Sequence, residues 1–143
     1  MTLSKETEVI YDAHRGQDYD SANPPLYDSS TFHQQVLGGD TTYDYARSGN
    51  PNRNLLEEKL AKLEGADYAF AYASGIAAIS SVLLTLNSGD HVILPDDVYG
   101  GTFRLTEQIL TRFNIRFTTV DTTDVTAIED AIESQTKLIY LET

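Results

Sequence analysis

The sequence predicts an α/β protein built on a mainly parallel sheet, with an extended arm in front of it. After residue 50, short apolar runs alternate with helical patterns of ten or so residues. Such alternation is typical of parallel strands joined by right-handed helical crossovers, which cover both faces of the sheet. Residues 1–50 show no sustained period of either kind, and this favours an extended segment.

The first regular element is a helix with recognisable signals at both ends. Asn50 is a typical N-cap, Pro51 suits the first helical position, and Gly65 provides a stop. Between them, leucines recur at helical spacing and predict one apolar face. The elements expected after this helix are strand 68–72, helix 75–86, strand 91–94, helix 101–112, strand 115–120, helix 124–133 and strand 137–141.

The chain therefore has two expected parts. Residues 1–50 form an extended N-terminal arm, and residues 51–143 form the first part of an α/β domain. The arm carries many apolar and aromatic side chains but no periodic pattern with which to bury them. We expect these side chains to lie against a neighbouring subunit, so that the protein is a homo-oligomer.

Charge and composition exclude several functions. The chain has 22 acidic and 10 basic residues, and the net charge of -12 repels phosphate backbones and anionic lipids. We therefore expect no nucleic-acid partner and no membrane partner. The chain has no cysteine, no apolar run near the roughly 20 residues of a membrane span, and a polar start unlike a signal peptide. These features indicate the cytoplasm.

Small and polar residues directly follow the predicted strands. The carboxyl ends of parallel strands share one edge of the sheet, where α/β proteins bind their ligands. Ser74 and Gly75 stand at this edge at the start of a helix, where the free amides of Gly75 and Ile76 suit an anion. A strand-to-helix turn also favours small residues for steric reasons alone. The motif therefore indicates either an anion site or only a tight turn.

Three further side chains suit a planar, phosphorylated ligand. Tyr99 precedes Gly100 and Gly101, which let the backbone bend so that the phenol ring projects over the same edge and stacks on a heterocycle. Tyr45 and Arg47 precede the first helix, and a guanidinium suits bidentate phosphate recognition. Taken singly, each is also an ordinary loop residue. The three histidines show no metal-ligand spacing, so no metal site is expected.

The three blocks that carry these residues occur in a defined order. They are Tyr45-Ala-Arg-Ser-Gly-Asn-Pro51, Ala73-Ser-Gly-Ile-Ala-Ala78 and Asp96-Asp-Val-Tyr-Gly-Gly-Thr102. Their order and spacing resemble those of the Cys/Met-metabolism family of pyridoxal 5'-phosphate (PLP) enzymes. This family includes cystathionine β-lyase, γ-synthase and γ-lyase, and the O-acylhomoserine sulfhydrylases. Two positions depart from the family pattern: Asn52 stands where Thr is usual, and Ile76 where Met or Leu is common.

The resemblance implies the large domain of a type I PLP-dependent transferase, of the aminotransferase-like kind and incomplete. By this resemblance, Gly75 and Ile76 would give backbone amides to the cofactor phosphate. Tyr45 and Arg47 would reach the same phosphate from the adjacent subunit of a dimer within a homotetramer. Tyr99 would stack on the pyridine ring and take part in proton transfer. Arg104 matches a position near the substrate.

The resemblance also implies three groups that these residues do not supply: the Schiff-base lysine, an aspartate at the pyridine nitrogen and an arginine for the substrate carboxylate. The lysines of the chain lie in the tail, on the first helix, or at the sheet edge opposite the site; they are Lys5, Lys59, Lys62 and Lys137. We expect the three groups in the remainder of the same chain, beyond Thr143. The 143 residues alone are therefore expected to be inactive.

The expected function is that of the N-terminal part of a PLP-dependent enzyme acting on a sulfur-containing amino acid. The block Asp96–Thr102 favours cystathionine β-lyase, and the alternatives are γ-synthase, γ-lyase and O-acylhomoserine sulfhydrylase. A magnesium-dependent phosphoryl-transfer or receiver-like domain is an alternative of another class. It rests on the acidic residues that share the functional edge of the sheet, namely Asp96, Asp97, Asp121 and Glu142.

Overall fold

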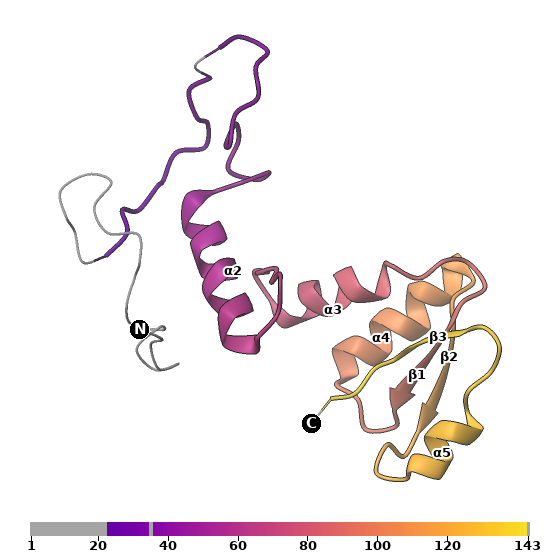
Figure 1. Cartoon of the computed structure of the whole chain (residues 1–143). Coiled ribbons are helices and arrows are strands. Elements are labelled where there is room, and N and C mark those ends of the chain that lie inside the picture. Colours follow the sequence, from indigo (N-terminus) through magenta and orange to yellow (C-terminus); the bar gives the residue numbers. More distant parts are fainter. Residues whose placement is uncertain (1–22, 35, 143) are drawn as a thin grey trace. The chain divides into compact units, whose positions relative to one another are not determined.

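The computed structural model describes residues 23–34 and 36–142. The chain divides between residues 71 and 72 into two compact units. Helix α2 belongs to the first unit, and a small sheet with its helices belongs to the second (Figure 1). In the described part of the chain, no helix combines the length and the apolar character needed to cross a membrane.

Helix α2 spans Pro51–Glu64 and confirms both predicted ends. The side chain of Asn50 accepts hydrogen bonds from the amides of Asn52 and Arg53, which would otherwise be unpaired at the helix start. At the other end, Gly65 has a φ of 66°, a left-handed conformation that glycine adopts without steric cost.

The arm residues that the structure describes are irregular and lie against the start of α2. Segments 30–32 and 44–46 run antiparallel through two backbone hydrogen bonds of 2.9 Å. The side chain of Asn52 accepts from the amide of Tyr27 at 2.8 Å and donates to the carbonyl of Pro25 at 2.7 Å. The residue that departs from the family pattern thus joins the arm to the helix.

The second unit contains a parallel sheet of three strands. They are β1 (His91–Pro95), β2 (Arg116–Val120) and β3 (Thr136–Ile139), in the order β2-β1-β3. Both neighbours of β1 run parallel to it, and all five residues of β1 are buried. The predicted α/β class and the parallel sheet are therefore confirmed.

Three α-helices and one short 3₁₀ helix surround this sheet. They are α3 (Gly75–Leu83), α4 (Gly100–Gln108), the 3₁₀ helix η1 (Leu110–Phe113) and α5 (Val125–Asp130). The expected helix 101–112 is thus divided between α4 and η1. The chain steps from β1 to β2 through α4, and then back past β1 to β3 through α5. Right-handed crossovers in opposite directions require α4 and α5 to lie on opposite faces, as Figure 1 shows.

The core of this unit lies between the sheet and helices α3 and α4. Its fully or nearly fully buried side chains are Leu83, Val92, Leu94, Leu110 and Ile115. Partly buried side chains pack against them from α3, α4, β2 and β3, among them Ile79, Leu105, Phe117 and Leu138. This packing attaches α3 to the core through Ile79 and Leu83, and α4 through Leu105.

The predicted strand 68–72 is wrong. These residues form no helix or strand, and no ladder partner lies beside them in the described residues. Their aromatic side chains are open to solvent: Tyr68 is 80% exposed and Phe70 is 75% exposed. The alternation of large and small residues satisfies the local requirement for a strand, but a strand also needs a neighbour for its backbone groups.

Candidate functional site

Helix α3 begins with two backbone amides that have no hydrogen-bond partner in the described part of the chain. Ser74 is the N-cap, and its carbonyl and hydroxyl oxygens accept from the amide of Ala77 at 3.1 and 3.3 Å. The amides of Gly75 and Ile76 make no hydrogen bond to any residue that the structure describes. A Cβ atom on Gly75 would meet nothing within 4 Å, so the start of α3 is uncrowded on that side.

This arrangement fits the phosphate of PLP. The first N–H groups of a helix point outward from its start, where the positive end of the helix dipole also lies. A phosphate monoester there would accept both hydrogen bonds and gain from the dipole. The residues expected from the sequence to bind an anion, Gly75 and Ile76, thus have the free donors that this role requires.

Tyr99 stands at the start of α4, directly after the turn that follows β1. It is the N-cap residue but makes no capping hydrogen bond through its side chain. The residue is 60% exposed, so one part of the phenol ring is available for contact. Asp96 and Asp97, which precede Tyr99 in the turn, are exposed and do not cap α4.

Arg104 lies one turn further along α4 and reaches back toward the start of the helix. Its Nη1 atom is 3.5 Å from the position that a Cβ atom on Gly100 would take. The guanidinium makes no hydrogen bond or ion pair among the residues that the structure describes. It therefore has all its donors available at this end of the helix.

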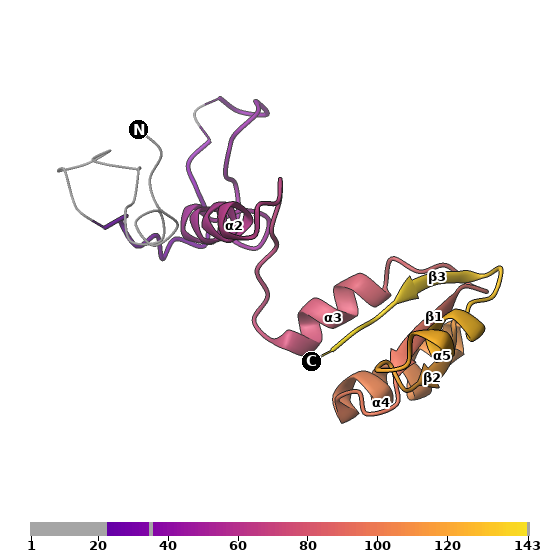
Figure 2. The same cartoon turned by 60° about the horizontal axis from the view of Figure 1, so that its bottom comes forward.

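The starts of α3 and α4 lie at one end of the sheet. Figures 1 and 2 agree on this, and the C-terminus of the chain lies at the same end. It is the edge at which the parallel strands have their carboxyl ends. The structure thus brings Gly75, Ile76, Tyr99 and Arg104 to the edge that the sequence predicted.

The same edge holds a tyrosine from the end of β3. The hydroxyl of Tyr140 donates to a carboxylate oxygen of Glu142 at 3.0 Å. Burial, and then the neighbouring carboxylate, raise the pKa of Tyr140 above its ordinary value. Tyr140 therefore stays protonated at neutral pH and acts as a donor. The sequence contained no spacing signal for this residue.

Tyr45 and Arg47 belong to the other unit and share a tight turn there. The carbonyl of Tyr45 accepts from the amides of Ser48 and Gly49 at 2.9 and 3.1 Å. The guanidinium carbon of Arg47 lies 4.8 Å from the centre of the Tyr45 ring, a cation–π contact. Both residues are exposed, so their polar groups face outward together.

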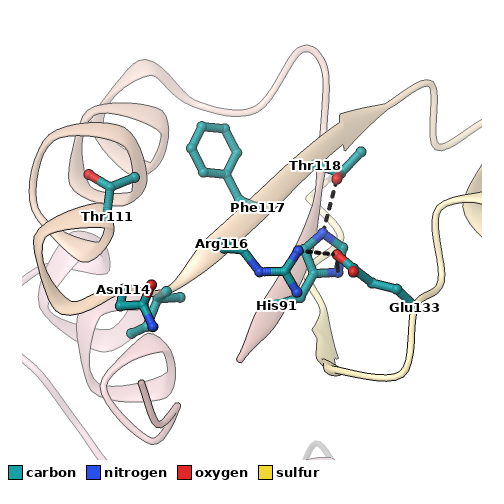
Figure 3. A pocket seen from close by; sticks show the side chains of 8 residues that line it. His91, Thr111, Asn114, Arg116, Phe117, Thr118 and Glu133 are labelled. Carbon is teal, nitrogen blue, oxygen red and sulfur yellow. Dashed lines mark hydrogen bonds and ion pairs between the residues drawn. The ribbon is translucent and has the colours of Figure 1, made fainter. Parts of the chain in front are cut away.

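A separate pocket lies at the opposite, amino-terminal edge of the sheet (Figure 3). His91, which is fully buried, pairs through Nδ1 with the hydroxyl of Thr136 at 2.8 Å and through Nε2 with that of Thr118 at 2.9 Å. Arg116 donates to Glu133 at 2.8 Å. The hydrogen bond from Arg116 lowers the pKa of Glu133.

These side chains form hydrogen bonds with one another. The pocket is therefore lined by a polar network that joins the starts of the three strands. It holds none of the residues predicted to bind a ligand. Sequence reasoning assigned His91 no chemistry, and only the folded structure reveals that its ring nitrogens contact one threonine from each neighbouring strand.

Metal binding at the acidic edge finds no support in the geometry. Among the described residues, no three His, Cys, Asp or Glu side chains gather as a metal site would require. Asp121 instead accepts from the hydroxyl and the amide of Thr123, which together lower its pKa. The acidic residues that suggested a magnesium site are therefore not gathered in the way that this alternative expects, among the residues described.

Comparison with known proteins adds independent information. The chain matches the family model described as Cys/Met metabolism PLP-dependent enzyme over residues 6–143. It is 79% identical to cystathionine beta-lyase of Staphylococcus haemolyticus over 143 residues, which cover 100% of this chain and 37% of that protein. The chain thus spans little more than a third of that relative's length.

Two solved structures are similar over almost the whole chain. The first is cystathionine gamma-lyase from Lactobacillus plantarum complexed with L-serine, with a TM-score of 0.90 and 44% identity over 99% of this chain and 37% of that one. The second is a Campylobacter jejuni protein assigned as an O-acetylhomoserine (thiol)-lyase. It carries N'-pyridoxyl-lysine-5'-monophosphate and matches with a TM-score of 0.86 and 29% identity over 98% of this chain and 37% of that one.

Proposed function

The chain belongs to the Cys/Met metabolism family of PLP-dependent enzymes, and we propose that it forms the phosphate-binding and ring-covering part of the PLP site in a cystathionine β-lyase. The observation that carries this proposal is the pair of unpaired amides at the start of α3, at the same sheet edge as Tyr99. The 79% identity to a cystathionine beta-lyase supports the β-lyase over its relatives. Family membership sets aside the phosphoryl-transfer alternative.

In the proposed site, the amides of Gly75 and Ile76 bind the cofactor phosphate. Backbone donors suit this role because the helix fixes their position and its dipole favours a negative charge there. The side chain of Ile76 is then free to differ from the Met or Leu common in the family. This makes the departure at residue 76 compatible with phosphate binding.

Tyr99 covers the pyridine ring in this proposal. Its exposed phenol ring offers a flat apolar face, and its hydroxyl group is placed to hold or move a proton near the substrate. Arg104 carries an unpaired guanidinium at the same end of α4 and would act close to the substrate. Neither role needs a residue from the arm.

Tyr45 and Arg47 complete the phosphate site from the neighbouring subunit of a dimer, within a homotetramer. Two features support this assignment. Both side chains face outward from one turn, and the Arg47 guanidinium keeps its N–H donors free of other protein acceptors in the described residues. A guanidinium and a phenol together would add charge and donors to the two amides.

When bound, PLP withdraws electrons from the α-carbon of an amino acid, so that a sulfur leaving group can depart from the neighbouring carbon. Lys137 lies near the start of β3, at the amino-terminal edge of the sheet, and so does not suit the covalent role, while Lys59 and Lys62 lie on α2 in the other unit. We assign the covalent lysine, the aspartate at the pyridine nitrogen and the carboxylate-binding arginine to the rest of the full-length protein. A cytoplasmic location agrees with the absence of cysteine.

The experiment is an assay of the full-length protein with PLP and cystathionine. Elimination at the β-carbon releases homocysteine and leaves pyruvate and ammonia, whereas elimination at the γ-carbon releases cysteine and leaves 2-oxobutyrate and ammonia. We expect pyruvate and homocysteine. A product mixture dominated by 2-oxobutyrate would favour the γ-lyase alternative. A full-length protein that takes up no PLP would refute the whole proposal.

A further inference from the structure

The guanidinium of Arg53 holds three successive carbonyl groups of the turn that carries Tyr45 and Arg47. Its Nη1 donates to the carbonyl of Ala46 at 3.3 Å. Its Nη2 donates to the carbonyls of Arg47 and Ser48 at 3.4 and 3.1 Å. The single side chain of Arg53, on α2, therefore provides hydrogen-bond donors for all three of these carbonyl groups.

Arg53 is itself fixed in position. Its amide donates to the side chain of Asn50 in the first turn of α2, at 3.3 Å. Its Nε lies 3.9 Å from a carboxylate oxygen of Glu57, one helical turn further on, and two-thirds of the side chain is buried. A planar fork of five N–H donors can serve several acceptors in this way, whereas the single ammonium of a lysine cannot hold the same three.

The opposite side of the turn is held by residues 30–31 earlier in the arm. The amide of Ala46 donates to the carbonyl of Ser30 at 2.9 Å, and Thr31 and Tyr45 face each other as an isolated bridge. The turn between Tyr45 and Ser48 is therefore fixed from two directions. Its backbone is held by the arm on one side and by the Arg53 guanidinium on the other.

The two arginines Arg47 and Arg53 thus differ in what their guanidinium groups contact. The guanidinium of Arg53 is taken up by backbone carbonyls of the protein itself. The guanidinium of Arg47 has the Tyr45 ring as its contact and no hydrogen-bond acceptor among the described residues. Arg53 therefore stabilises the backbone of the turn, whereas the N–H donors of Arg47 remain available for a ligand.

We propose that Arg53 is a positioning residue for the cofactor phosphate: it presets the turn so that Tyr45 and Arg47 meet the phosphate together. This inference rests on the proposed function, in which those two side chains bind the phosphate. Without Arg53, the turn would have to be ordered when the cofactor binds, and that cost would reduce affinity. The chemistry at the substrate would not change once PLP is bound.

The test is a PLP titration of the full-length apoprotein, followed by the absorbance of the bound cofactor, with kcat measured at saturating PLP. For Arg53→Gln we expect the Kd for PLP to rise on the order of tenfold, as loss of charge-assisted hydrogen bonds implies. The kcat at saturating PLP should stay close to that of the wild type. Arg116→Gln is the matched control, because Arg116 donates to the side chain of Glu133 and holds no backbone turn.

Arg53→Lys keeps the charge and the helix propensity, and it decides the question if Arg53→Gln does not fold. We expect a rise in the Kd for PLP of a few-fold with a thermal midpoint like that of the wild type, because one ammonium replaces the planar fork. Wild-type PLP affinity in a folded Arg53→Lys or Arg53→Gln protein would overturn the inference.

A second comparison separates this inference from the proposed function. In the double variant Tyr45→Phe, Arg47→Gln, adding Arg53→Gln should raise the Kd no further, because the groups that Arg53 positions are already gone. An added rise of the same factor as in the wild type would overturn the positioning role. If the double variant itself binds PLP like the wild type, the proposed function of Tyr45 and Arg47 fails instead.

Discussion

The ring of Tyr99 occupies the space that a side chain on residue 101 would need. A Cβ atom built on Gly101 would clash with Cε1 of Tyr99 and would lie 3.0 Å from Cδ1. Carbon atoms that are not bonded prefer a separation of about 3.5 to 4.0 Å. The position of the proposed ring-covering phenol therefore depends on the absence of a side chain two residues later.

Gly101→Ala should displace the Tyr99 ring in the full-length protein. We expect the Kd for PLP to rise about tenfold and kcat to fall, because the phenol no longer covers the cofactor from the same position. A PLP titration and a steady-state assay measure the two effects.

Gly100→Ala is the control for this substitution. A Cβ atom there would lie 3.5 Å from Nη1 of Arg104, which is an ordinary contact with the end of a flexible side chain. This variant should bind PLP as the wild type does. Equal behaviour of the two alanine variants would contradict the dependence of Tyr99 on Gly101.

Replacing Tyr99 itself separates ring contact from proton transfer. Tyr99→Phe keeps the flat ring and should retain PLP affinity while kcat falls by roughly 10²-fold or more, as expected for loss of a proton-transferring group. Tyr99→Ala should also raise the Kd for PLP, by about tenfold. A Tyr99→Phe enzyme with unchanged kcat would show that the hydroxyl has no part in the reaction.

Asn52→Ala should lower the stability of the full-length protein. The change removes hydrogen bonds to the backbone of Pro25 and Tyr27, which join the arm to α2. We expect a loss of about 1–2 kcal/mol, seen as a lower thermal midpoint. Asn54→Ala removes one side-chain hydrogen bond to Tyr43 and should cost less. A thermal midpoint for Asn52→Ala equal to that of the wild type would argue against a stabilising role for the hydrogen bonds between Asn52 and the arm.

The ion pair between Arg116 and Glu133 predicts a pH-dependent stability. The hydrogen bond from Arg116 lowers the pKa of Glu133 in the folded protein below its ordinary value of 4.5. The contribution is therefore present above that value and is lost as the pH falls through the lowered pKa.

Thermal midpoints of the wild type and Glu133→Gln should differ at neutral pH and converge in acid. Both forms then carry an uncharged group at residue 133. A difference that stays constant as the pH falls through the carboxylate range would contradict the assignment to this ion pair.

Local signals accounted for helix α2 almost residue by residue. Asn50, Pro51 and Gly65 act on amides, carbonyls and φ angles within one turn of their own positions, so they can be recognised without knowledge of the fold. The proposed anion site at Gly75 and Ile76 can be recognised in the same way, because it consists of the first amides of a helix.

The misassigned strand 68–72 illustrates the opposite case. Tyr68 and Phe70 alternate with alanine as a strand would, but no partner pairs with them in the residues that the structure describes. Whether such a segment becomes a strand depends on a neighbour that is distant in the sequence. The pattern of residues carries no information about that neighbour.

By itself, the sequence determined the α/β class and the ends of α2, and it indicated the helix start proposed to bind an anion, because each of these depends on periodicity or on groups a few residues apart. Only the tertiary structure decided that Arg53 holds the turn at Tyr45, that Gly101 makes room for Tyr99, and that His91 joins three strands. Those contacts depend on how the backbone folds back on itself, and this geometry determines which polar groups meet.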